Sequence, residues 1–314
     1  MVCVGKAGQD TFLQSEAFKP KKENGIYYEH MVLGNKYYVD DAVVATGNNA
    51  VNAAVTFARQ RLPVKLITTI GDDEAGAHIL RALDKEHIDT SEMRVDEAAK
   101  TSFSTILLAP NGERTILDFP GSVKIVQTQL ESVKNEGEWL YVSSLGSMTS
   151  LKHLCKLAKA HDVKIAFNPA SYELQHLQET ADLLEFVDIF AVNKEEAKRF
   201  VDGSTIGELA KKLAETVDIV LVSDGPRGAA ACDGERLVQA GLYEKVPVVD
   251  RTGAGDAFTS GFVSQIALGK KLEEAIIFAS ANSTSVVGKV GANVGALHSH
   301  HQLHDMPMHI SVVR

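Results

Sequence analysis

A turn of small residues carries the most specific chemistry in this sequence. The run Gly253-Ala254-Gly255-Asp256 precedes a segment whose apolar residues recur at helical spacing. The first N–H groups of a helix have no partner within it, and the helix dipole is positive at that end. The N–H groups of these four residues can therefore hold a phosphate, and the same helix end should keep Asp256 ionised as a proton acceptor. This combination indicates phosphoryl transfer to a hydroxyl group.

The elements around this turn are predicted to be a strand and a helix. Residues 245–249 alternate like a strand, and the helix after the turn is expected to stop at Gly269. An ordinary glycine turn with an acidic first-turn residue is the alternative for so short a motif. The longer string from Asp250 to Phe262, D-x-T-G-A-G-D-A-F-x-x-G-F, is more specific. It resembles the C-terminal signature of the ribokinase-like (PfkB) carbohydrate kinase family.

Composition sets the class of protein. The 314 residues are 45% hydrophobic and 23% charged, which suits one large α/β domain or two domains. The formal net charge of −9, with no basic cluster, argues against a nucleic-acid partner. No basic leader and no long apolar run occur, so neither a signal peptide nor a membrane span is expected. The three cysteines lack C-x-x-C spacing, which favours reduced packing residues in a cytoplasmic protein.

The second half of the chain alternates predicted strands with predicted helices. Such alternation requires crossover connections and gives a mostly parallel sheet with helices on both faces. The resemblance implies the same ribokinase-like α/β fold. The predicted strands are residues 139–145, 163–167, 188–192 and 218–223, and the predicted helices are 151–160, 173–184, 194–200 and 206–215.

Two stretches lack helical periodicity and are predicted to form a small separate β-sheet. They are residues 13–46 and 101–119, and both contain turn residues between extended segments. The α/β domain would then comprise residues 1–12, 47–100 and 120–314. The resemblance implies that the small sheet is a lid over the sugar site and a dimer contact. Two surface hairpins without a function are the alternative.

Candidate acceptor-binding residues lie near the N-terminus. Asp10 follows the first predicted strand, at an edge where open α/β sheets bind ligands. Gly47 and Asn52 match the family's G-G-x-x-x-N motif, and Asn48 replaces its second glycine. The resemblance implies that Asp10, Gly47, Asn48 and Asn52 face the hydroxyls of the sugar. A solvated loop aspartate and a capping asparagine are the alternatives.

Candidate cation-binding residues follow from the same resemblance. Asn193 and Glu196 match an N-x-x-E element associated with Mg²⁺ and phosphate, and carboxylate and amide oxygens suit that hard cation. Helix capping by this pair is the alternative. Asp250 and Thr252, together with the loop at residues 288–293, correspond to the backbone that binds a monovalent cation such as K⁺ in many members.

Candidate nucleotide-binding residues lie after the last predicted parallel strand and in a later helix. Ser223, Gly225 and Gly228 resemble the family's T-x-G-x-x-G loop, with serine keeping the hydroxyl. A small-residue helix then borders the adenine in the family, which points to Asn282 or Ser280. Close helix packing is the alternative for either residue.

The C-terminal tail departs from the family. Five histidines between residues 298 and 309 could mark a transition-metal site, but no ordered set of cysteine or carboxylate partners accompanies them. A surface tail ending in a strand at residues 309–313 is the favoured interpretation. The sequence also lacks a G-x-x-x-x-G-K-[ST] P-loop and a G-x-G-x-x-G dinucleotide motif after its first strand.

The sequence as a whole predicts a homodimeric kinase that uses ATP and Mg²⁺ to phosphorylate a small free sugar of the ribose, fructose or keto-sugar acid type. A nucleoside kinase of the same family is the first alternative, because aromatic residues in the predicted lid could stack on a base. A sugar-binding regulator without catalysis is the second, although Asp256 is intact. The aromatic residues concerned are Tyr27, Tyr28, Tyr37 and Tyr38.

Overall fold

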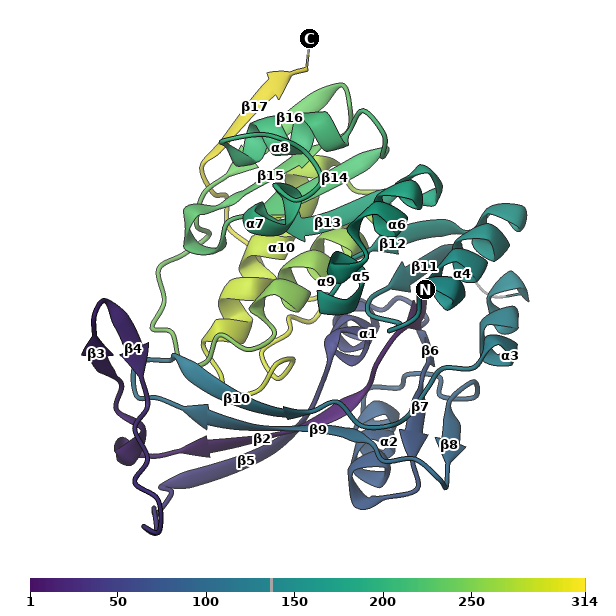
Figure 1. Cartoon of the computed structure of the whole chain (residues 1–314). Helices are drawn as coiled ribbons and strands as arrows, with labels where there is room; N and C mark the ends of the chain where they lie inside the picture. Colours follow the sequence, from purple (N-terminus) through teal and green to yellow (C-terminus); the bar gives the residue numbers. More distant parts are fainter. Residues whose placement is uncertain (136–137, 314) are drawn as a thin grey trace.

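A nine-stranded sheet forms the body of the computed structural model, which describes residues 1–135 and 138–313 (Figure 1). Its order is β17-β16-β15-β14-β13-β12-β11-β1-β6, and the six strands from β14 to β6 pair in parallel, whereas β15, β16 and β17 pair antiparallel. The strands are β1 (Val2–Val4), β6 (Lys65–Ile67), β11 (Trp139–Val142), β12 (Lys164–Phe167), β13 (Ile189–Asn193), β14 (Ile219–Ser223), β15 (Ala229–Cys232), β16 (Arg236–Ala240) and β17 (Met308–Val312).

Helices pack on both faces of this sheet because alternate residues of each central strand enter different cores. In β1, Cys3 belongs to the core beneath α1, α2, α9 and α10, whereas Val2 and Val4 belong to the core beneath α4 and α8. The parallel, doubly covered sheet confirms the predicted fold class. The helices are α1 (Asn49–Arg59), α2 (Glu74–Lys85), α3 (Gln127–Leu130), α4 (Met148–Ala160), α5 (Ser171–Gln175), α6 (Leu177–Asp182), α7 (Lys194–Ala197), α8 (Ile206–Leu213), α9 (Ala254–Ala267) and α10 (Leu272–Val287), with short 3₁₀ turns at Glu16–Phe18, Glu131–Asn135, Leu184–Phe186 and Gly225–Arg227.

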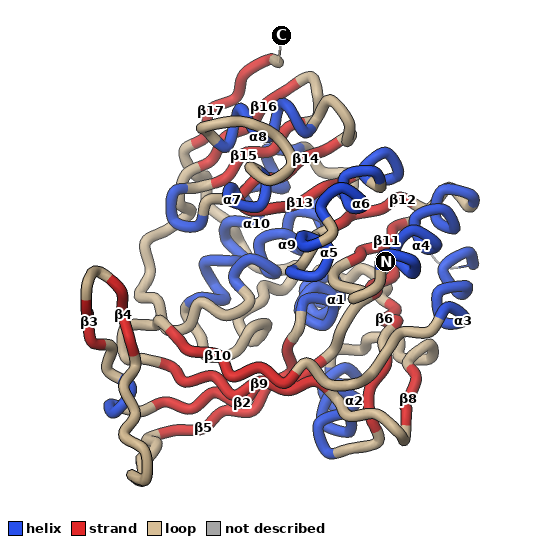
Figure 2. The backbone as a smooth tube through the Cα atoms, in the orientation of Figure 1, coloured by secondary structure: helices blue, strands red, loops and turns tan. Residues whose placement is uncertain are grey.

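A second sheet extends away from the body and is called the lid sheet below (Figure 2). Its order is β10-β9-β2-β5, so its two outer strands, β10 and β5, come from separate parts of the chain. A small hairpin of β3 and β4 lies beyond its outer end (Figure 1), and β7 pairs with β8 elsewhere. These strands are β2 (Gly8–Gln14), β3 (Lys21–Glu23), β4 (Ile26–Tyr28), β5 (Asp41–Gly47), β7 (Thr69–Gly71), β8 (Arg94–Asp96), β9 (Ser102–Leu108) and β10 (Arg114–Phe119).

The lid differs from its predicted boundaries. The expected boundary at residue 13 falls inside β2, because this strand leaves the body at Gly8 and carries Asp10 into the lid sheet. The small hairpin turns at Asn24-Gly25, both with positive φ, whereas Gly34-Asn35, one of the turns within the stretch predicted as extended, joins no strands. Short β3 and β4 therefore replace the longer extended segments expected there.

Two further differences lie in the body. Residues 245–249 form no strand, and the N–H of Val249 donates instead to the carbonyl of Val287 at 2.8 Å. The β15–β16 hairpin was not predicted, because its first strand, Ala229–Cys232, is built from alanines that give no alternating pattern. The expected C-terminal strand does form, as edge strand β17. None of the helices in the described ranges is long and apolar enough to span a bilayer.

Candidate active site

The turn before α9 forms because Gly253 adopts a conformation that other residues rarely reach. Its φ is +76°, and a Cβ at this position would lie 2.0 Å from the carbonyl oxygen of Ala292. The close approach brings the 288–293 loop against the start of the helix. Ala254, Gly255 and Asp256 then occupy the first three helical positions, where N–H groups lack acceptors within the helix. The turn thus presents the donors that were predicted for a phosphate.

Asp256 is partly buried and bound by an amide from another part of the chain. Asn52 Nδ2 in α1 donates to Asp256 Oδ2 at 2.7 Å. Burial raises the pKa of Asp256 to about 6, and the hydrogen bond from Asn52 opposes that rise. The helix end was expected to keep this carboxyl ionised, and desolvation acts in the opposite direction. A carboxyl with this pKa is still ionised at neutral pH, and it is a stronger base than a solvated aspartate.

The predicted acceptor residues assemble beside Asp256. Asp10 is buried on β2, and a Cβ on Gly47 would lie 1.9 Å from Asp10 Oδ2, so only glycine leaves room for this carboxyl. Burial raises the pKa of Asp10 to about 6 as well, with Asp118, Asp250 and Asp256 adding to the effect and a hydrogen bond from Ser104 opposing it. The site therefore brings together acidic groups that can accept hydrogen bonds from the hydroxyls of an acceptor.

Asn48 fits where the family motif has its second glycine because its backbone adopts a glycine-like conformation. Its φ is +73°, a region that asparagine tolerates better than most residues. The residue precedes α1, but its side chain makes no capping hydrogen bond and instead donates to Ser102 Oγ at 3.4 Å. The capping alternative is thus wrong for Asn48. Its amide lies between the start of α1 and the lid sheet.

An open cavity of about 410 Å³ lies on the other side of the turn. Ala254 and Gly255 at the start of α9 form one end of it, and the loop with Ser223, Gly225 and Gly228 forms another wall, as predicted. Gly228 has φ +103°, and a Cβ there would lie 2.1 Å from the carbonyl oxygen of Ala240. The volume is within the range of small-molecule sites. The remaining wall includes residues 241–246, Val248, Phe258 and one face of α10.

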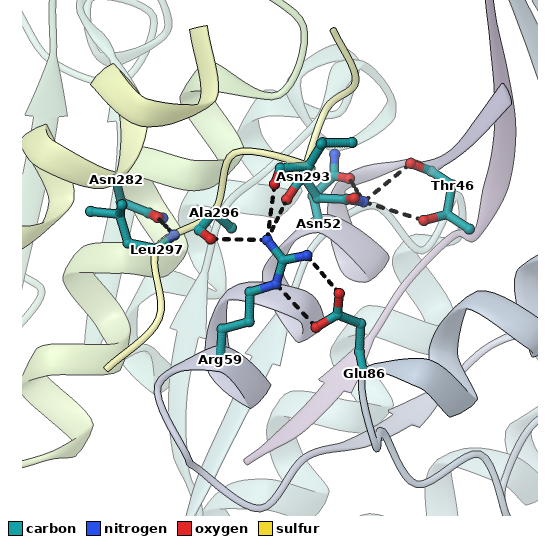
Figure 3. Close-up of polar contacts among 9 residues, drawn as sticks. Thr46, Asn52, Arg59, Glu86, Asn282, Asn293, Ala296 and Leu297 are labelled. Atoms are coloured by element: carbon teal, nitrogen blue, oxygen red, sulfur yellow. Dashed lines mark hydrogen bonds and ion pairs between the residues drawn. The ribbon is translucent and has the colours of Figure 1, made fainter. Parts of the chain in front are cut away.

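Asn282 does not line this cavity, contrary to prediction. Its side chain is fully buried, and its Nδ2 donates to the carbonyl of Ala257 at 2.8 Å. Its Oδ1 accepts from the N–H of Leu297 at 2.7 Å (Figure 3). The polar groups of α10 at the cavity are those of Ser280, Ser283 and Thr284. Their i, i+3, i+4 spacing is visible in the sequence and was the signal that could have identified this face.

Asn193 and Glu196 form the helix cap that was the alternative to a metal role. Asn193 Oδ1 accepts from the N–H of Glu196, and Glu196 Oε2 accepts from the N–H of Asn193, each at 2.9 Å. Burial raises the pKa of Glu196, and these hydrogen bonds oppose the rise. Within the described residues Oε1 of Glu196 has no hydrogen-bond partner, so this oxygen suits a hydrated Mg²⁺ that takes one carboxylate and keeps its waters.

Asp250 joins two loops at the predicted monovalent-cation site. It is fully buried, with Oδ1 accepting from the N–H of Thr252 at 2.9 Å and Oδ2 from the N–H of Gly291 at 3.1 Å. Thr252 Oγ1 is buried without a hydrogen-bond partner among the residues that the structure describes. An unpaired buried hydroxyl is costly, so this oxygen fits a cation ligand.

The histidine-rich tail forms ring contacts. The rings of His304 and Tyr243 stack with their centroids 4.1 Å apart, and the backbone N–H of His304 donates to the hydroxyl of Tyr243 at 2.9 Å. His298 and His300 stack on each other at 5.6 Å. In residues 1–135 and 138–313, no group of three or more histidine, cysteine, aspartate or glutamate side chains is placed to share a metal ion.

The family model for pfkB family carbohydrate kinases matches residues 24–298. The chain belongs to the pfkB family. It is an ATP-dependent kinase of the sugar and nucleoside kinase class, with the ribokinase fold. Both the family and the fold confirm the resemblance described from the signature motifs.

Two relatives illustrate the range of activities within this pfkB group. The ribokinase of Haemophilus influenzae is 27% identical over 79% of this chain and 83% of its own length. The 5-dehydro-2-deoxygluconokinase of Bacillus velezensis is 30% identical over 77% of this chain and 79% of its own.

The solved structures that resemble this chain likewise include a ribokinase and an adenosine kinase. Arabidopsis thaliana ribokinase, complexed with ribose and ATP, has a TM-score of 0.75 at 24% identity and covers 95% of each chain. Adenosine kinase from Sinorhizobium meliloti has a TM-score of 0.76 at 19% identity, over 93% of this chain and 94% of its own. At such identities the likeness establishes the fold alone.

Proposed function

We propose that this pfkB kinase transfers the γ-phosphoryl group of ATP to a hydroxyl of a small free sugar of the ribose, fructose or keto-sugar acid type. The observation that carries the proposal is the position of Asp256. Its backbone neighbours Ala254 and Gly255 line the cavity, while its carboxylate bonds Asn52 beside Asp10. A base between a nucleotide and an acceptor site is what in-line transfer requires.

The chain's own groups suit each part of that transfer. Asp256 takes the proton of the attacking hydroxyl, and its pKa of about 6 leaves it ionised at neutral pH. The N–H groups of Gly253, Ala254, Gly255 and Asp256 hold the charge that develops on the phosphoryl oxygens. The lid sheet excludes water, which would otherwise compete as the acceptor.

A sugar is preferred over a nucleoside because the residues identified on the acceptor side are polar. Asp10, Asn48 and Asn52 can bind hydroxyls, and an acceptor that left them unpaired would be strongly penalised. The lid tyrosines are largely exposed, unlike the buried Asp10: Tyr27 is 62% exposed and Tyr38 is 76% exposed. The sugar-kinase relatives support the same choice.

Two cations complete the proposed site. Glu196 and Asn193 would hold Mg²⁺, which would supply positive charge to neutralise the phosphates during transfer. K⁺ would bind near Thr252 and Asp250, where it would order the loop behind the phosphate-holding turn. Unpaired oxygens on Glu196 and Thr252 in the described chain support these positions.

A homodimer formed through the lid sheet is part of the proposal. Strands β5 and β10 are open edges, and one face of the sheet exposes apolar side chains, which together need covering in water. Light scattering should give twice the monomer mass at micromolar concentration, and a monomer would contradict the dimer. The exposed side chains on this face are Val44, Phe103, Leu117 and Phe119.

A cytoplasmic location completes the proposal. It rests on the cysteines, which are all buried and unpaired, as expected in a reducing compartment.

The test of the proposed function is ADP formation from ATP with a matched panel of acceptors. Ribose, fructose and keto-sugar acids are compared with adenosine, inosine and other nucleosides at equal concentrations, and products are identified by mass. At least one free sugar should give a far higher kcat/KM than any nucleoside. A nucleoside turned over much faster than every sugar would assign the chain to the nucleoside kinases. The absence of ADP formation with every acceptor would favour the non-catalytic regulator.

A further inference from the structure

Asn52 lies between the base and a second asparagine. Its Nδ2 donates to Asp256 Oδ2 at 2.7 Å. Its Oδ1 accepts from Asn293 Nδ2 at 2.9 Å (Figure 3). Asn52 and Asn293 are 4% and 8% exposed, so water offers little competition for these hydrogen bonds. An asparagine amide can rotate by half a turn, which swaps the positions of its oxygen and its nitrogen. The ionised Asp256 carboxylate only accepts, whereas its protonated form can donate to a reversed amide. The partner on the far side of Asn52 therefore decides whether the amide can reverse when Asp256 is protonated.

Asn293 has its own orientation fixed by a group that cannot reverse. Its Nδ2 also donates to the backbone carbonyl of Thr46 at 3.1 Å and approaches Thr46 Oγ1 at 3.3 Å. A carbonyl oxygen only accepts, so Asn293 must present its nitrogen to it. The same nitrogen then requires the oxygen of Asn52, which leaves the nitrogen of Asn52 for Asp256. The polarity of the whole chain of hydrogen bonds follows from one backbone carbonyl.

Arg59 holds the backbone that carries Asn293. Its Nη1 donates to the carbonyls of Asn293, Val294 and Ala296 at 3.1, 3.1 and 2.9 Å (Figure 3). Its Nε and Nη2 pair with Glu86 at 3.0 and 2.6 Å. Arg59 ends α1, the helix that also carries Asn52. The loop is thus anchored independently of the asparagine side chain, which separates a backbone role from an amide role.

We propose that Asn293 is a positioning residue for phosphoryl transfer: it locks the Asn52 amide so that its N–H group faces the carboxylate of Asp256. This inference rests on the proposed role of Asp256 as the base. In this orientation Asn52 stabilises the ionised carboxylate and fixes Oδ2, which leaves Oδ1 to accept the proton of the acceptor hydroxyl. With the amide reversed, its oxygen would face the carboxylate and repel it.

The surroundings of Asp256 make this one donor important. The titratable groups that face it are Asp10 on β2 and Tyr141 on β11, and Asp118 and Asp250 add negative charge around Asp10. None of the four is a cation. Burial favours the protonated carboxyl, and the N–H of Asn52 opposes it. Loss or reversal of the amide leaves desolvation unopposed, so the pKa of Asp256 must rise.

The experiment measures that pKa directly in the full-length enzyme. Aspartate carboxyls are labelled with ¹³C and titrated by NMR, with the Asp256 signal assigned from its loss in Asp256→Asn. Asn293→Ala and the nearly isosteric Asn293→Leu should each raise the pKa of Asp256 by about one unit, the scale of a charge-assisted hydrogen bond. The acid limb of kcat/KM should move up by the same amount.

Two controls separate positioning from general loosening. Arg59→Gln removes the loop anchor but keeps the amide, so it should lower the unfolding temperature without moving the titration of Asp256. Asn52→Leu should raise the pKa as Asn293→Leu does, and the double variant should add nothing further, because both act through one donor.

An unchanged pKa in either folded Asn293 variant overturns the inference, as does an equal shift in Arg59→Gln. The titration needs no turnover. If Asp256→Asn proves fully active, the proposed role of Asp256 as the base fails, yet the titration still decides whether Asn293 orients Asn52.

Discussion

The acceptor side and the nucleotide side of Asp256 differ in how far their polar groups are already paired. On the acceptor side, Asn52 of α1 is already bonded to Asp256 of α9 and to Asn293 of the 288–293 loop, and Asp10 on β2 is bonded to Ser104. On the nucleotide side, the start of α9 faces an open cavity of about 410 Å³. A preorganised polar site rejects ligands that leave its groups unpaired, whereas an open pocket discriminates weakly. Selectivity is therefore expected on the acceptor side.

Gly47 and Gly255 show the same difference between the two sides. A Cβ on Gly47 would meet the Asp10 carboxylate at 1.9 Å, whereas a Cβ on Gly255 would meet no protein atom within 4 Å. One glycine keeps space for a functional side chain. The other keeps space for whatever enters the cavity.

The largest expected effect comes from removing the base between the two sides. Asp256→Asn keeps the size of the side chain and the donors of the turn but cannot accept a proton. A general base contributes about 10²–10⁴ in rate, so kcat should fall by that order while ATP affinity, measured by calorimetry, changes little. Circular dichroism checks the fold. A folded variant with near-normal kcat would remove Asp256 from the mechanism.

The glycine pair should separate the two sides. Gly47→Ala displaces the Asp10 carboxylate, and misplacing a positioning group by about 1 Å costs on the order of 10²-fold, so the KM for sugar should rise strongly with ATP affinity unchanged. Gly255→Ala is the matched control and should weaken ATP while leaving the KM for sugar unaltered. Its unfolding temperature should not fall, since alanine suits a helix better than glycine. Equal effects of both substitutions on both substrates would contradict the proposed separation of the acceptor side from the nucleotide side.

Glu196→Gln should have a smaller effect on the nucleotide side. The amide keeps the size and the acceptor for the Asn193 N–H but loses the charge that favours Mg²⁺. We expect a loss of about tenfold in kcat/KM at low Mg²⁺, largely restored at high Mg²⁺. A titration of rate against Mg²⁺ concentration measures this, and a loss that Mg²⁺ does not restore would assign Glu196 to helix capping alone.

The smallest effect should come from the C-terminal tail. His304 stacks on Tyr243, which lines the cavity wall. A ring pair contributes about 0.5–1.5 kcal/mol, so His304→Ala should raise the KM for ATP by a few-fold and leave the KM for sugar unchanged. His300→Ala, whose ring contacts His298 instead, is the control. The same change in both variants would mean that the wall does not depend on this stack.

Local pattern was enough to predict most of the fold. The parallel strands and their crossover helices follow from apolar periodicity, and the turn before α9 follows from a contiguous motif. The β15–β16 hairpin and residues 245–249 did not follow, because short apolar runs do not distinguish strand from irregular backbone without their neighbours. Asp10 was identified as a site residue, but its place within the lid sheet depends on pairing with β5 and β9.

Long-range side-chain contacts could not be predicted from the sequence. Asn52 meets Asp256 across 204 residues and Asn293 across 241, and no spacing rule connects them. The raised pKa of Asp256 could not be predicted for the same reason. Its helix position is visible in the sequence, whereas the burial that overrides it arises only when distant elements pack together.

The most direct test of the central claim is the pH dependence of kcat/KM in the wild-type chain and in Asp256→Asn. Asp256 must be ionised to act as the base. Activity should therefore rise with pH through a midpoint near 6, which is the pKa of the Asp256 carboxyl in the folded protein. Asp10 titrates in the same range, so the assignment depends on the variant. The account predicts that this rising limb is lost in the residual activity of Asp256→Asn. The same limb, retained with the same midpoint in that variant, would contradict it.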